Sequence, residues 1–326
     1  MPAEEGAGLS SSGTAGGWIR SPVSGRPIRV GGPTFKKLLL EGFALRDNEL
    51  CAKERQVQQT AEALEDGFRD GDVMDGDDRL LERGWRALYE DEAIVVVEKG
   101  PGLCTVPGVR PETHDCLLTR VQERFPAVRV VHRLDRDTSG ILVLARNAEV
   151  HRTLSMAFEA REVDKTYIAL VDGHVPGPGG EIDGEWGLID LPIGKDTGQR
   201  AQQTPWLRRM CVDLASGRPS RTLYRTLLQE KGSPALPRSL VALKPVTGRS
   251  HQLRVHMHAL GHTILGDEIY GDEVQISRGK WEAGSGDRRL CLHAHKLSFT
   301  HPTTGLAVRY AAPCCFLKIA PDVDVQ

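Results

Sequence analysis

A short polar stretch between two apolar runs constrains the fold of this chain more than any other feature. Residues 132–140 read HRLDRDTSG, and the flanking runs at residues 128–131 and 141–145 are rich in valine, isoleucine and leucine. Such runs around a tight polar segment predict two strands joined by a loop. Loops held by rigid strands are frequent positions for catalytic groups. Asp135 is therefore a candidate reacting carboxylate, and a side-chain cap of the turn is its structural alternative.

The remaining elements do not alternate regularly between strand and helix. Short apolar runs predict strands at residues 93–97, 166–171 and 240–243, and apolar stripes at helical spacing predict helices at residues 114–125 and 147–161. A third helix is expected to begin at a Ser250 cap and to end at Gly261. Since no strand–helix repeat is present, a doubly wound parallel sheet is disfavoured. We predict an α+β fold with a mixed, mainly antiparallel sheet and flanking helices.

The composition is that of an ordinary globular protein. Of 326 residues, 40% are hydrophobic and 26% are charged. No apolar run approaches the roughly 20 residues that span a bilayer, so no membrane association is expected. The N-terminus is acidic and lacks the apolar region of a secretory signal. The seven cysteines are odd in number and form no CxxC pair, which is typical of reduced thiols. We expect an intracellular protein, with the cytoplasm preferred and an organelle or the nucleus left open.

Composition also divides the chain into three segments. Residues 1–17 are rich in glycine, serine and alanine and predict a disordered leader. Residues 18–84 form an acidic, partly helical N-terminal extension of unknown function, and residues 85–326 form the catalytic domain. Residues 1–92 carry 12 Lys and Arg against 18 Asp and Glu, whereas the remainder carries 30 against 26. A mildly basic globular part is compatible with an RNA partner bound in a local basic cleft.

Several blocks of this sequence resemble RluA-type pseudouridine synthases. Residues 132–140 match the HRLDxxTSG signature of that family at every fixed position. Residues 244–257 read KPVTGRSHQLRVHM and resemble the TGRxHQxRVH block, and residues 165–167 resemble its Lys-x-Tyr. Residues 99–103 read KGPGL where the family normally has Lys-Pro-x-Gly-Leu, a departure that removes no catalytic group. The resemblance covers about residues 89–313.

The resemblance implies the pseudouridine synthase fold, with an active-site cleft across the sheet, and a reaction. A flipped-out uridine loses its C1′–N1 bond and its base is rejoined through C5. Asp135 would act as a nucleophile at C1′ or as a base at C2′. Arg249 would pair with this carboxylate and keep it ionised. Tyr167 would stack on the base and take part in proton transfer at C5.

The resemblance also implies substrate-binding residues. Arg133 would be inserted into the RNA to help flip the uridine, and Leu253 would form an apolar wall under the base. His132 and Thr138 complete the substrate-binding set. Ordinary structural roles remain as alternatives: a phosphate contact for Arg133, a core position for Leu253, a half-buried strand position for Tyr167 and a surface cation for Arg249.

Three other activities compete with this interpretation. A glycoside hydrolase would need two carboxylates flanking the bond, and only Asp137 neighbours Asp135. A catalytically retired RNA-binding protein on the same fold would be expected to have lost Asp135, Tyr167 or Arg249. A zinc enzyme is disfavoured because His256 and His258, two positions apart on a predicted helix, point to different faces.

The expected function is therefore an RNA isomerase that needs no cofactor and no metal. Residues 244–257 and 259–262 look most like the RluA branch proper, whose members modify uridine in tRNA, in large-subunit rRNA, or in both. No S4-like RNA-binding module is found in residues 1–84. We expect a monomer whose partner is one of these RNAs.

Overall fold

The computed structural model describes residues 84–177, 185–198, 201–202, 208–230, 237–278, 289–319 and 325, with the backbone of five short strands before residue 84. These strands are β1 (Trp18–Arg20), β2 (Pro27–Arg29), β3 (Phe43–Arg46), β4 (Glu49–Ala52) and β5 (Arg69–Asp70). The predicted disordered leader and most of the predicted helical part of residues 18–84 lie outside the described residues. The described stretches of the N-terminal extension are strands rather than helix, and β5 pairs in parallel with β17.

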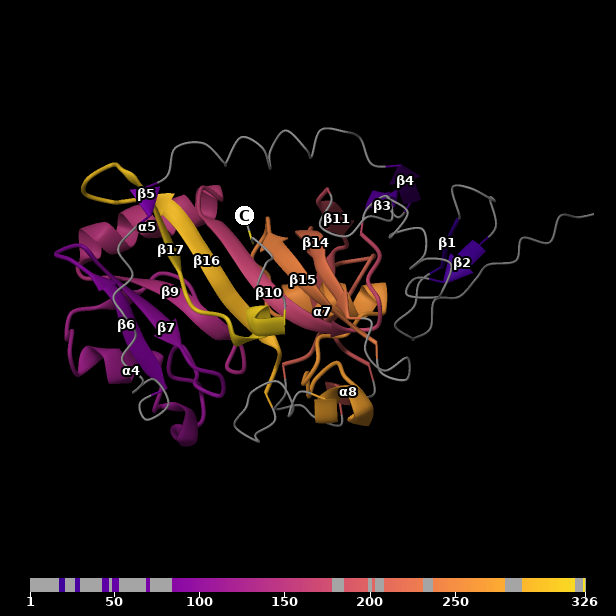
Figure 1. Ribbon diagram of the computed structural model, residues 1–326, viewed down its shortest axis with the longest axis horizontal. Helices are drawn as coiled ribbons and strands as arrows, with labels where there is room; N and C mark the ends of the chain where they lie inside the picture. The colour runs from indigo at the N-terminus through magenta and orange to yellow at the C-terminus, as the bar shows by residue number, and fades with distance from the viewer. Residues whose placement is uncertain are drawn as a thin grey trace, which may run out of the picture.

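One large mixed sheet crosses the molecule (Figure 1). Its strands run in the order β11 (Gly187–Asp190), β14 (Arg221–Glu230), β15 (Arg238–Pro245), β10 (Asp164–Asp172), β16 (Leu292–Thr300), β9 (Ser139–Ala145), β7 (Ile94–Lys99) and β6 (Trp85–Glu90). β17 (Ala307–Ala311) pairs with β16, and β8 (Arg129–Val130) pairs with β9. Among the described strands only the β9–β16 and β5–β17 pairs are parallel. The predicted α+β class with a mixed, mainly antiparallel sheet is confirmed.

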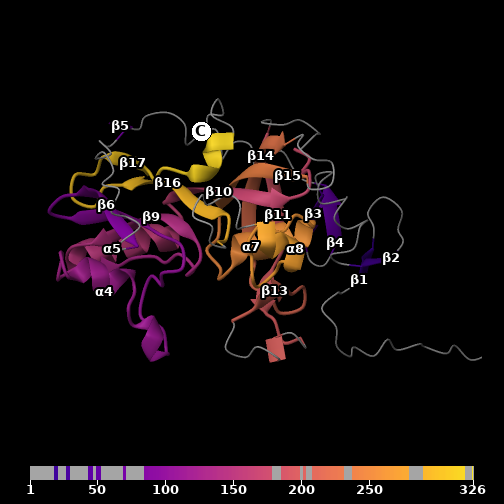
Figure 2. The same cartoon turned by 60° about the horizontal axis from the view of Figure 1, so that its bottom comes forward.

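Helices flank the sheet in two groups (Figure 2). The group beside β9 consists of α4 (Leu117–Gln122) and α5 (Ala148–Ala160), and the group beside β14 and β15 contains α7 (Gln252–Leu260) and α8 (Glu273–Arg278). Smaller elements are the hairpin of β12 (Ile193–Lys195) and β13 (Met210–Val212) and the 3₁₀ turns η2 (Pro111–Thr113) and η4 (Cys315–Ile319). Among the described residues, no helix combines the length and the apolar character that crossing a bilayer requires.

The buried side chains form two main cores rather than one. One core lies around β7 and β9 with α4 and α5, and the other lies around β10, β14 and β15 with α7. The first core also includes Ala294 and Leu297 of β16, whereas the second includes Leu292 of the same strand. Tyr167 of β10 packs against both cores. The seam between the two halves of the molecule therefore runs along β10 and β16.

The helix ends follow the sequence expectations in two places and depart from them in a third. Asn147 caps α5, since its side chain accepts a hydrogen bond from the Val150 N–H at 2.9 Å. Gly261 ends α7 with a φ of 89°. Ser250, however, is not the cap of α7: His251, with a φ of 56°, precedes the helix. The Oε1 of Gln252 accepts the Arg249 N–H at 3.0 Å, which fastens the loop before the helix, and the His251 side chain makes no capping hydrogen bond.

Gly140 shows why the loop after Asp135 must end in glycine. It lies at the start of β9, between β7 and β16, with a φ of 116°. A Cβ built at this position would lie 2.2 Å from the Ala294 carbonyl oxygen and 2.5 Å from its nitrogen. Both the backbone conformation and the contact with β16 therefore exclude a side chain. Glycine at this position allows the loop that carries Asp135 to continue directly into the buried strand β9.

We predict that Gly140→Ala lowers the free energy of unfolding by ~3 kcal/mol or more, because left-handed strain and a backbone clash act together. Gly102→Ala is the matched control: its φ of 80° is also positive, but nothing lies within 4 Å of the added Cβ. That control should lose only ~1 kcal/mol. Urea unfolding of both variants measures the difference, and equal losses would contradict the importance of the β16 contact.

Candidate active site

A cleft of about 1020 Å³ is lined by segments from both halves of the molecule. The half built on β9 contributes residues 104–108 and 131–138, and the other half contributes residues 245–254. The cleft brings together all seven residues that the sequence predicted for the site: His132, Arg133, Asp135, Thr138, Tyr167, Arg249 and Leu253. The segments come from distant parts of the sequence, so the cleft exists only when the two halves are packed together.

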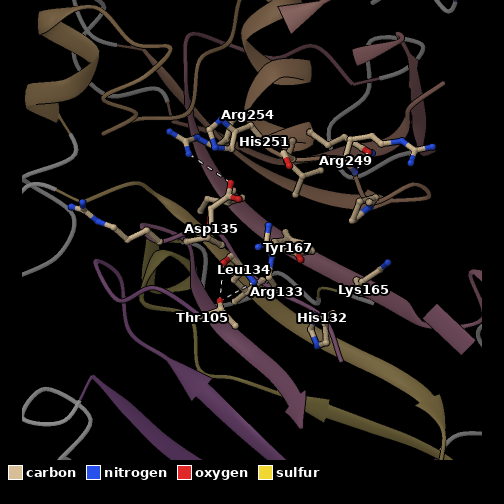
Figure 3. A pocket seen from close by; sticks show the side chains of 18 of the residues that line it. Thr105, His132, Arg133, Leu134, Asp135, Lys165, Tyr167, Arg249, His251 and Arg254 are labelled. Carbon is tan, nitrogen blue, oxygen red and sulfur yellow. Dashed lines mark hydrogen bonds and ion pairs between the residues drawn. The ribbon is translucent and has the colours of Figure 1, made fainter. Parts of the chain in front are cut away.

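The turn that carries Asp135 is fixed on both sides, and Figure 3 shows the side held by Thr105. The Thr138 N–H donates to the Asp135 carbonyl at 3.2 Å, which closes the turn. The hydroxyl of Thr105 donates to the Leu134 carbonyl at 2.8 Å and accepts the Leu134 N–H at 3.2 Å. On the other side of Asp135, Lys99 Nζ donates to the Arg136 carbonyl at 2.9 Å. The position of the Asp135 backbone is therefore set by neighbouring loops and not by the turn alone.

Lys99 is an unusual support for this turn because it is fully buried. Its ammonium group also donates to the carbonyls of Gly100 at 2.7 Å and Leu103 at 2.9 Å. Three carbonyl acceptors match its three N–H donors. Burial lowers the pKa of Lys99 to about 7, although the charges of Asp137, Cys104 and Asp135 oppose this shift. The lysine of the KGPGL block at residues 99–103 thus ties two loops together under the cleft.

The Asp135 carboxylate faces a buried arginine from α7. Arg254 Nη1 lies 3.6 Å from Asp135 Oδ2, and the Arg254 side chain is 3% exposed against 32% for Asp135 (Figure 3). Arg254 in turn forms two hydrogen bonds of 2.7 Å to the carboxylate of Asp267, which is fully buried. The N–H groups of Ile269 and Tyr270 satisfy Asp267 further. Arg254 therefore presents one N–H edge to Asp267 and another to the cleft.

Each of the two buried charges is stabilised by the other. Burial alone would lower the pKa of Arg254, but the hydrogen bonds and charge of Asp267, together with Asp135, raise it above its ordinary value. Burial alone would raise the pKa of Asp267, but its hydrogen bonds from Arg254 and from the backbone hold it lower than usual. The pair is ionised at neutral pH, so a fixed positive charge lies beside Asp135.

The expected pairing of Arg249 with Asp135 is wrong. The only partner that the structure gives the Arg249 side chain among the described residues is the Pro219 carbonyl, 3.5 Å from Nη2. In Figure 3 the Arg249 guanidinium points away from Asp135, whereas Arg254 points toward it. Arg249 precedes α7 in the loop, and Arg254 lies inside the helix on its buried face. The local geometry therefore assigns the carboxylate to the second arginine of the block.

Tyr167 lies on β10 and lines the cleft close to Asp135 (Figure 3). It pairs with Leu243 on one side and with Ala294 on the other, next to a register shift in the β10–β16 ladder. Burial, and then the negative charge of Asp135, raise the pKa of the Tyr167 hydroxyl above its ordinary value. The phenol therefore keeps its proton at neutral pH and can act as a hydrogen-bond donor in the cleft.

The four residues expected to bind substrate differ in how free they are to do so. His132 accepts the Val143 N–H at 3.2 Å and stacks on Phe158, with ring centroids 4.4 Å apart. Burial, with a contribution from Lys165, lowers the pKa of His132 to about 3, so it stays a neutral acceptor. Thr138 is buried, and Leu253 is 6% exposed and belongs to the core around α7. Arg133 is exposed at the cleft.

The histidines that suggested a zinc enzyme have other partners. His256 is buried and contacts the Thr222 hydroxyl at 2.9 Å and the Leu191 carbonyl at 3.0 Å. His258 contacts the Thr263 hydroxyl at 3.0 Å. Within the described part of the chain, no three His, Cys, Asp or Glu side chains are grouped to hold a metal ion. His251 lies at the cleft instead, with Nδ1 3.0 Å from the Tyr270 hydroxyl.

Sequence reasoning missed Arg254, Asp267 and the supporting Lys99 and Thr105. A signal for Arg254 was present, because it lies between Leu253 and Val255 on a helix that is mostly buried. An arginine in such a position needs a buried acidic partner. Asp267 is a nearby candidate in the sequence, but spacing alone does not show that its side chain turns back toward α7.

Comparisons with known proteins identify relatives of this chain. A family model described as RNA pseudouridylate synthase matches residues 93–259. A dual-specificity RNA pseudouridine synthase RluA of Vibrio parahaemolyticus is 41% identical over 236 residues, which cover 72% of this chain and 86% of that protein. The protein of the same name in Escherichia coli is 41% identical over 229 residues, which cover 70% of this chain and 93% of that protein.

A solved structure is also similar to this chain. The human RNA pseudouridylate synthase domain containing 1 protein superposes with a TM-score of 0.55 and 31% identity, covering 76% of this chain and 89% of that chain. The chain therefore belongs to the RNA pseudouridine synthase family, and within that family it is of the RluA type.

Proposed function

We propose that this protein isomerises a specific uridine of RNA to pseudouridine, with Asp135 as the reacting carboxylate. The observation that carries the proposal is the ion pair between Asp135, in a cleft, and the buried Arg254, which Asp267 holds in place. The C1′–N1 bond breaks, the base turns, and a C5–C1′ bond forms while the C5 proton is lost and N1 gains one. An ionised carboxylate next to the sugar serves either attack at C1′ or proton removal at C2′.

The neighbouring residues have separate roles in this proposal. Arg254 places a positive charge beside the Asp135 carboxylate and holds it in position, because its own orientation is set by Asp267. Tyr167 stacks on the base, and its protonated hydroxyl takes part in proton transfer at C5. Leu253 forms an apolar floor under the base, and Arg133, exposed at the cleft, helps to hold the RNA while the uridine is turned out of the stack. His132 and Thr138 shape the cleft wall.

The RNA substrate is proposed to be tRNA, large-subunit rRNA, or both. This choice is supported by the relatives named dual-specificity RNA pseudouridine synthases and by the agreement of residues 244–257 with the RluA type. The proposal includes a monomer that uses no cofactor and acts on RNA inside the cell. Because Asp135 and Tyr167 are both present and converge on one cleft, no observation favours the alternative of a catalytically retired RNA-binding protein.

Replacement of Asp135 by asparagine tests the proposed function directly. The variant keeps the shape of the side chain and removes the charge, so we expect turnover to fall by ~10⁴-fold or more while RNA binding is retained. Wild type and variant are incubated with total RNA from a bacterium that lacks its own synthases of this type. Pseudouridine is then mapped at single-nucleotide resolution.

Each outcome of this mapping leads to a different conclusion. Sites made by wild type and absent with the variant would support the isomerase and identify its RNA. Equal modification by both proteins would mean that Asp135 is not the reacting group. Binding without modification by wild type would favour the retired protein.

The link between Arg254 and Asp267 predicts that stability and activity can be separated. Arg254→Gln leaves a buried carboxylate without its partner, so we expect a loss of ~3–5 kcal/mol of unfolding free energy and at least a hundredfold loss of turnover. The double variant Arg254→Met with Asp267→Leu removes both charges and should regain most of the stability. It should regain none of the activity, because Asp135 still lacks a cation. Recovery of turnover in the double variant would argue against the positioning role.

Tyr167→Phe distinguishes proton transfer from stacking. The ring remains, so a stacking role alone predicts turnover within a few-fold of wild type. If the hydroxyl takes part in proton transfer, turnover should fall by ~10²–10⁴-fold with little change in RNA affinity. Single-turnover rates at saturating RNA, with Tyr167→Leu as the variant that also loses the ring, measure the two contributions.

A further inference from the structure

Arg249 has a side chain that the catalytic geometry does not use. It lines the cleft, but Arg254 has taken the place beside Asp135. Its Nε is buried without a hydrogen-bond partner, and its Nη2 has only the long contact of 3.5 Å with the Pro219 carbonyl. A buried guanidinium N–H with no acceptor costs free energy, so such a group is expected to have an acceptor in its working state.

Two more arginines lie close enough to Arg249 for their charges to affect its pKa. Burial lowers the pKa of Arg249, and the charges of Arg218 and then Arg161 lower it further. Arg161 also lines the cleft and is held at the end of α5 in a left-handed conformation with a φ of 65°. Arg218 is exposed and directly precedes Pro219, the residue that Arg249 contacts. Arg161 and Arg249 both line the cleft, and Arg218 adjoins Arg249 through Pro219, so three positive charges from three separate segments lie near one another.

These charges are not neutralised by the protein. Among the described residues, no ion pair joins Arg161, Arg218 or Arg249 to a carboxylate, although ten other arginines of the same part of the chain have one: Arg86, Arg110, Arg120, Arg124, Arg136, Arg209, Arg221, Arg238, Arg254 and Arg278. Glu159 is the one acidic residue of α5 at the cleft, and it is exposed. Like charges gathered without counter-ions indicate a site for an external anion.

We propose that Arg249, Arg161 and Arg218 form a binding site for a phosphodiester of the RNA strand next to the flipped uridine. The proposal rests on the proposed function and extends it. Figure 3 shows the Arg249 guanidinium directed away from Asp135, on the side of the cleft where Lys165 also lies. The sugar of the target must reach Asp135, so the adjoining backbone has to leave the cleft beside it. Phosphate contacts of this kind position a strand without reading its sequence.

The two arginines of the block at residues 244–257 then have different functions. Arg254, inside α7, serves the reacting carboxylate, and Arg249, in the loop before α7, serves the RNA backbone. Since both belong to one short segment, the phosphate and the sugar are held at a fixed separation. A strand anchored at the phosphate has its uridine delivered to Asp135, which lowers the entropic part of the barrier.

The test uses Arg249→Gln, Arg161→Gln and Arg218→Gln in the full chain, with Arg152→Gln as the control. Arg152 is an exposed arginine of α5 that does not line the cleft, so the charge change is the same. Affinity for a short oligouridylate is measured over a series of salt concentrations. Each lost phosphate contact should reduce the slope of log affinity against log salt by about 0.7. We expect that reduction and about tenfold weaker binding for Arg249→Gln, and no change for Arg152→Gln.

A second measurement locates the phosphate. The RNA whose uridine the mapping identifies is prepared with a single neutral methylphosphonate on either side of that uridine. One of the two substitutions should weaken binding by wild type and have no further effect on Arg249→Gln. With the unmodified RNA, KM of Arg249→Gln should rise more than kcat falls. Arg249→Lys, which keeps the charge, should retain the salt slope and shows that the effect is not a packing defect.

The outcomes separate this inference from the proposed function. If wild type isomerises RNA but Arg249→Gln has the salt slope and KM of Arg152→Gln, the phosphate site is wrong and the synthase stands. If kcat of Arg249→Gln falls like that of Asp135→Asn with KM unchanged, Arg249 belongs to the chemistry and the inference is also wrong. If wild type isomerises nothing, the proposed function fails, while the oligouridylate slopes still decide whether the three arginines bind phosphate.

Discussion

The buried ionic contact between Arg254 and Asp267 is the interaction on which the rest of the site depends. A guanidinium taken out of water is stable only with a fixed, hydrogen-bonded partner, and two hydrogen bonds of 2.7 Å meet that need. The pair fixes the orientation of an arginine that then has one N–H edge left for the cleft. Asp135 stays partly exposed, so it remains available to substrate while its charge is balanced from beneath. The supporting Arg254 and Asp267 are therefore buried, whereas the reacting carboxylate of Asp135 is partly exposed.

The rest of the fold brings the carboxylate to this arginine. Leu134, next to Asp135, belongs to one hydrophobic core, and Leu253, next to Arg254, belongs to the other, so the separation of the two charges is set by how the two halves pack along β10 and β16. Gly140 lets the turn enter the sheet against Ala294, and Lys99 and Thr105 fasten the turn to the loops beneath it. Each of these contacts is made to backbone atoms of the turn or of Ala294, although Lys99 and Thr105 contribute side chains. The geometry near Asp135 therefore tolerates little change in the backbone even where side chains vary.

Much of this structure could be predicted from the sequence, and the failures have physical causes. The strand–loop–strand around Asp135 and the helix from Asn147 follow from local apolar patterns and a cap. The seven cleft residues follow from the family resemblance, which reports shared geometry that local patterns do not contain. Two errors concern the start of α7: Ser250 does not cap it, and Arg249 does not meet Asp135. Both arise because His251 adopts a left-handed conformation and the Gln252 side chain binds the Arg249 N–H, which turns the chain before the helix begins. The expected helix in the N-terminal extension lies mainly outside the described residues.

The parallel pairing of β9 with β16 has a consequence for how the site comes into being. Ser139, at the edge of the Asp135 turn, contacts His293 across 154 positions of sequence. Closing so long a loop is slow and is rewarded only after both halves have collapsed, so this pairing is expected late in folding. During synthesis the Asp135 turn leaves the ribosome well before α7 and β16 do. A partly folded chain therefore has Asp135 without Arg254 beside it. The site that acts on RNA forms in one step, when the last strands pack onto the sheet.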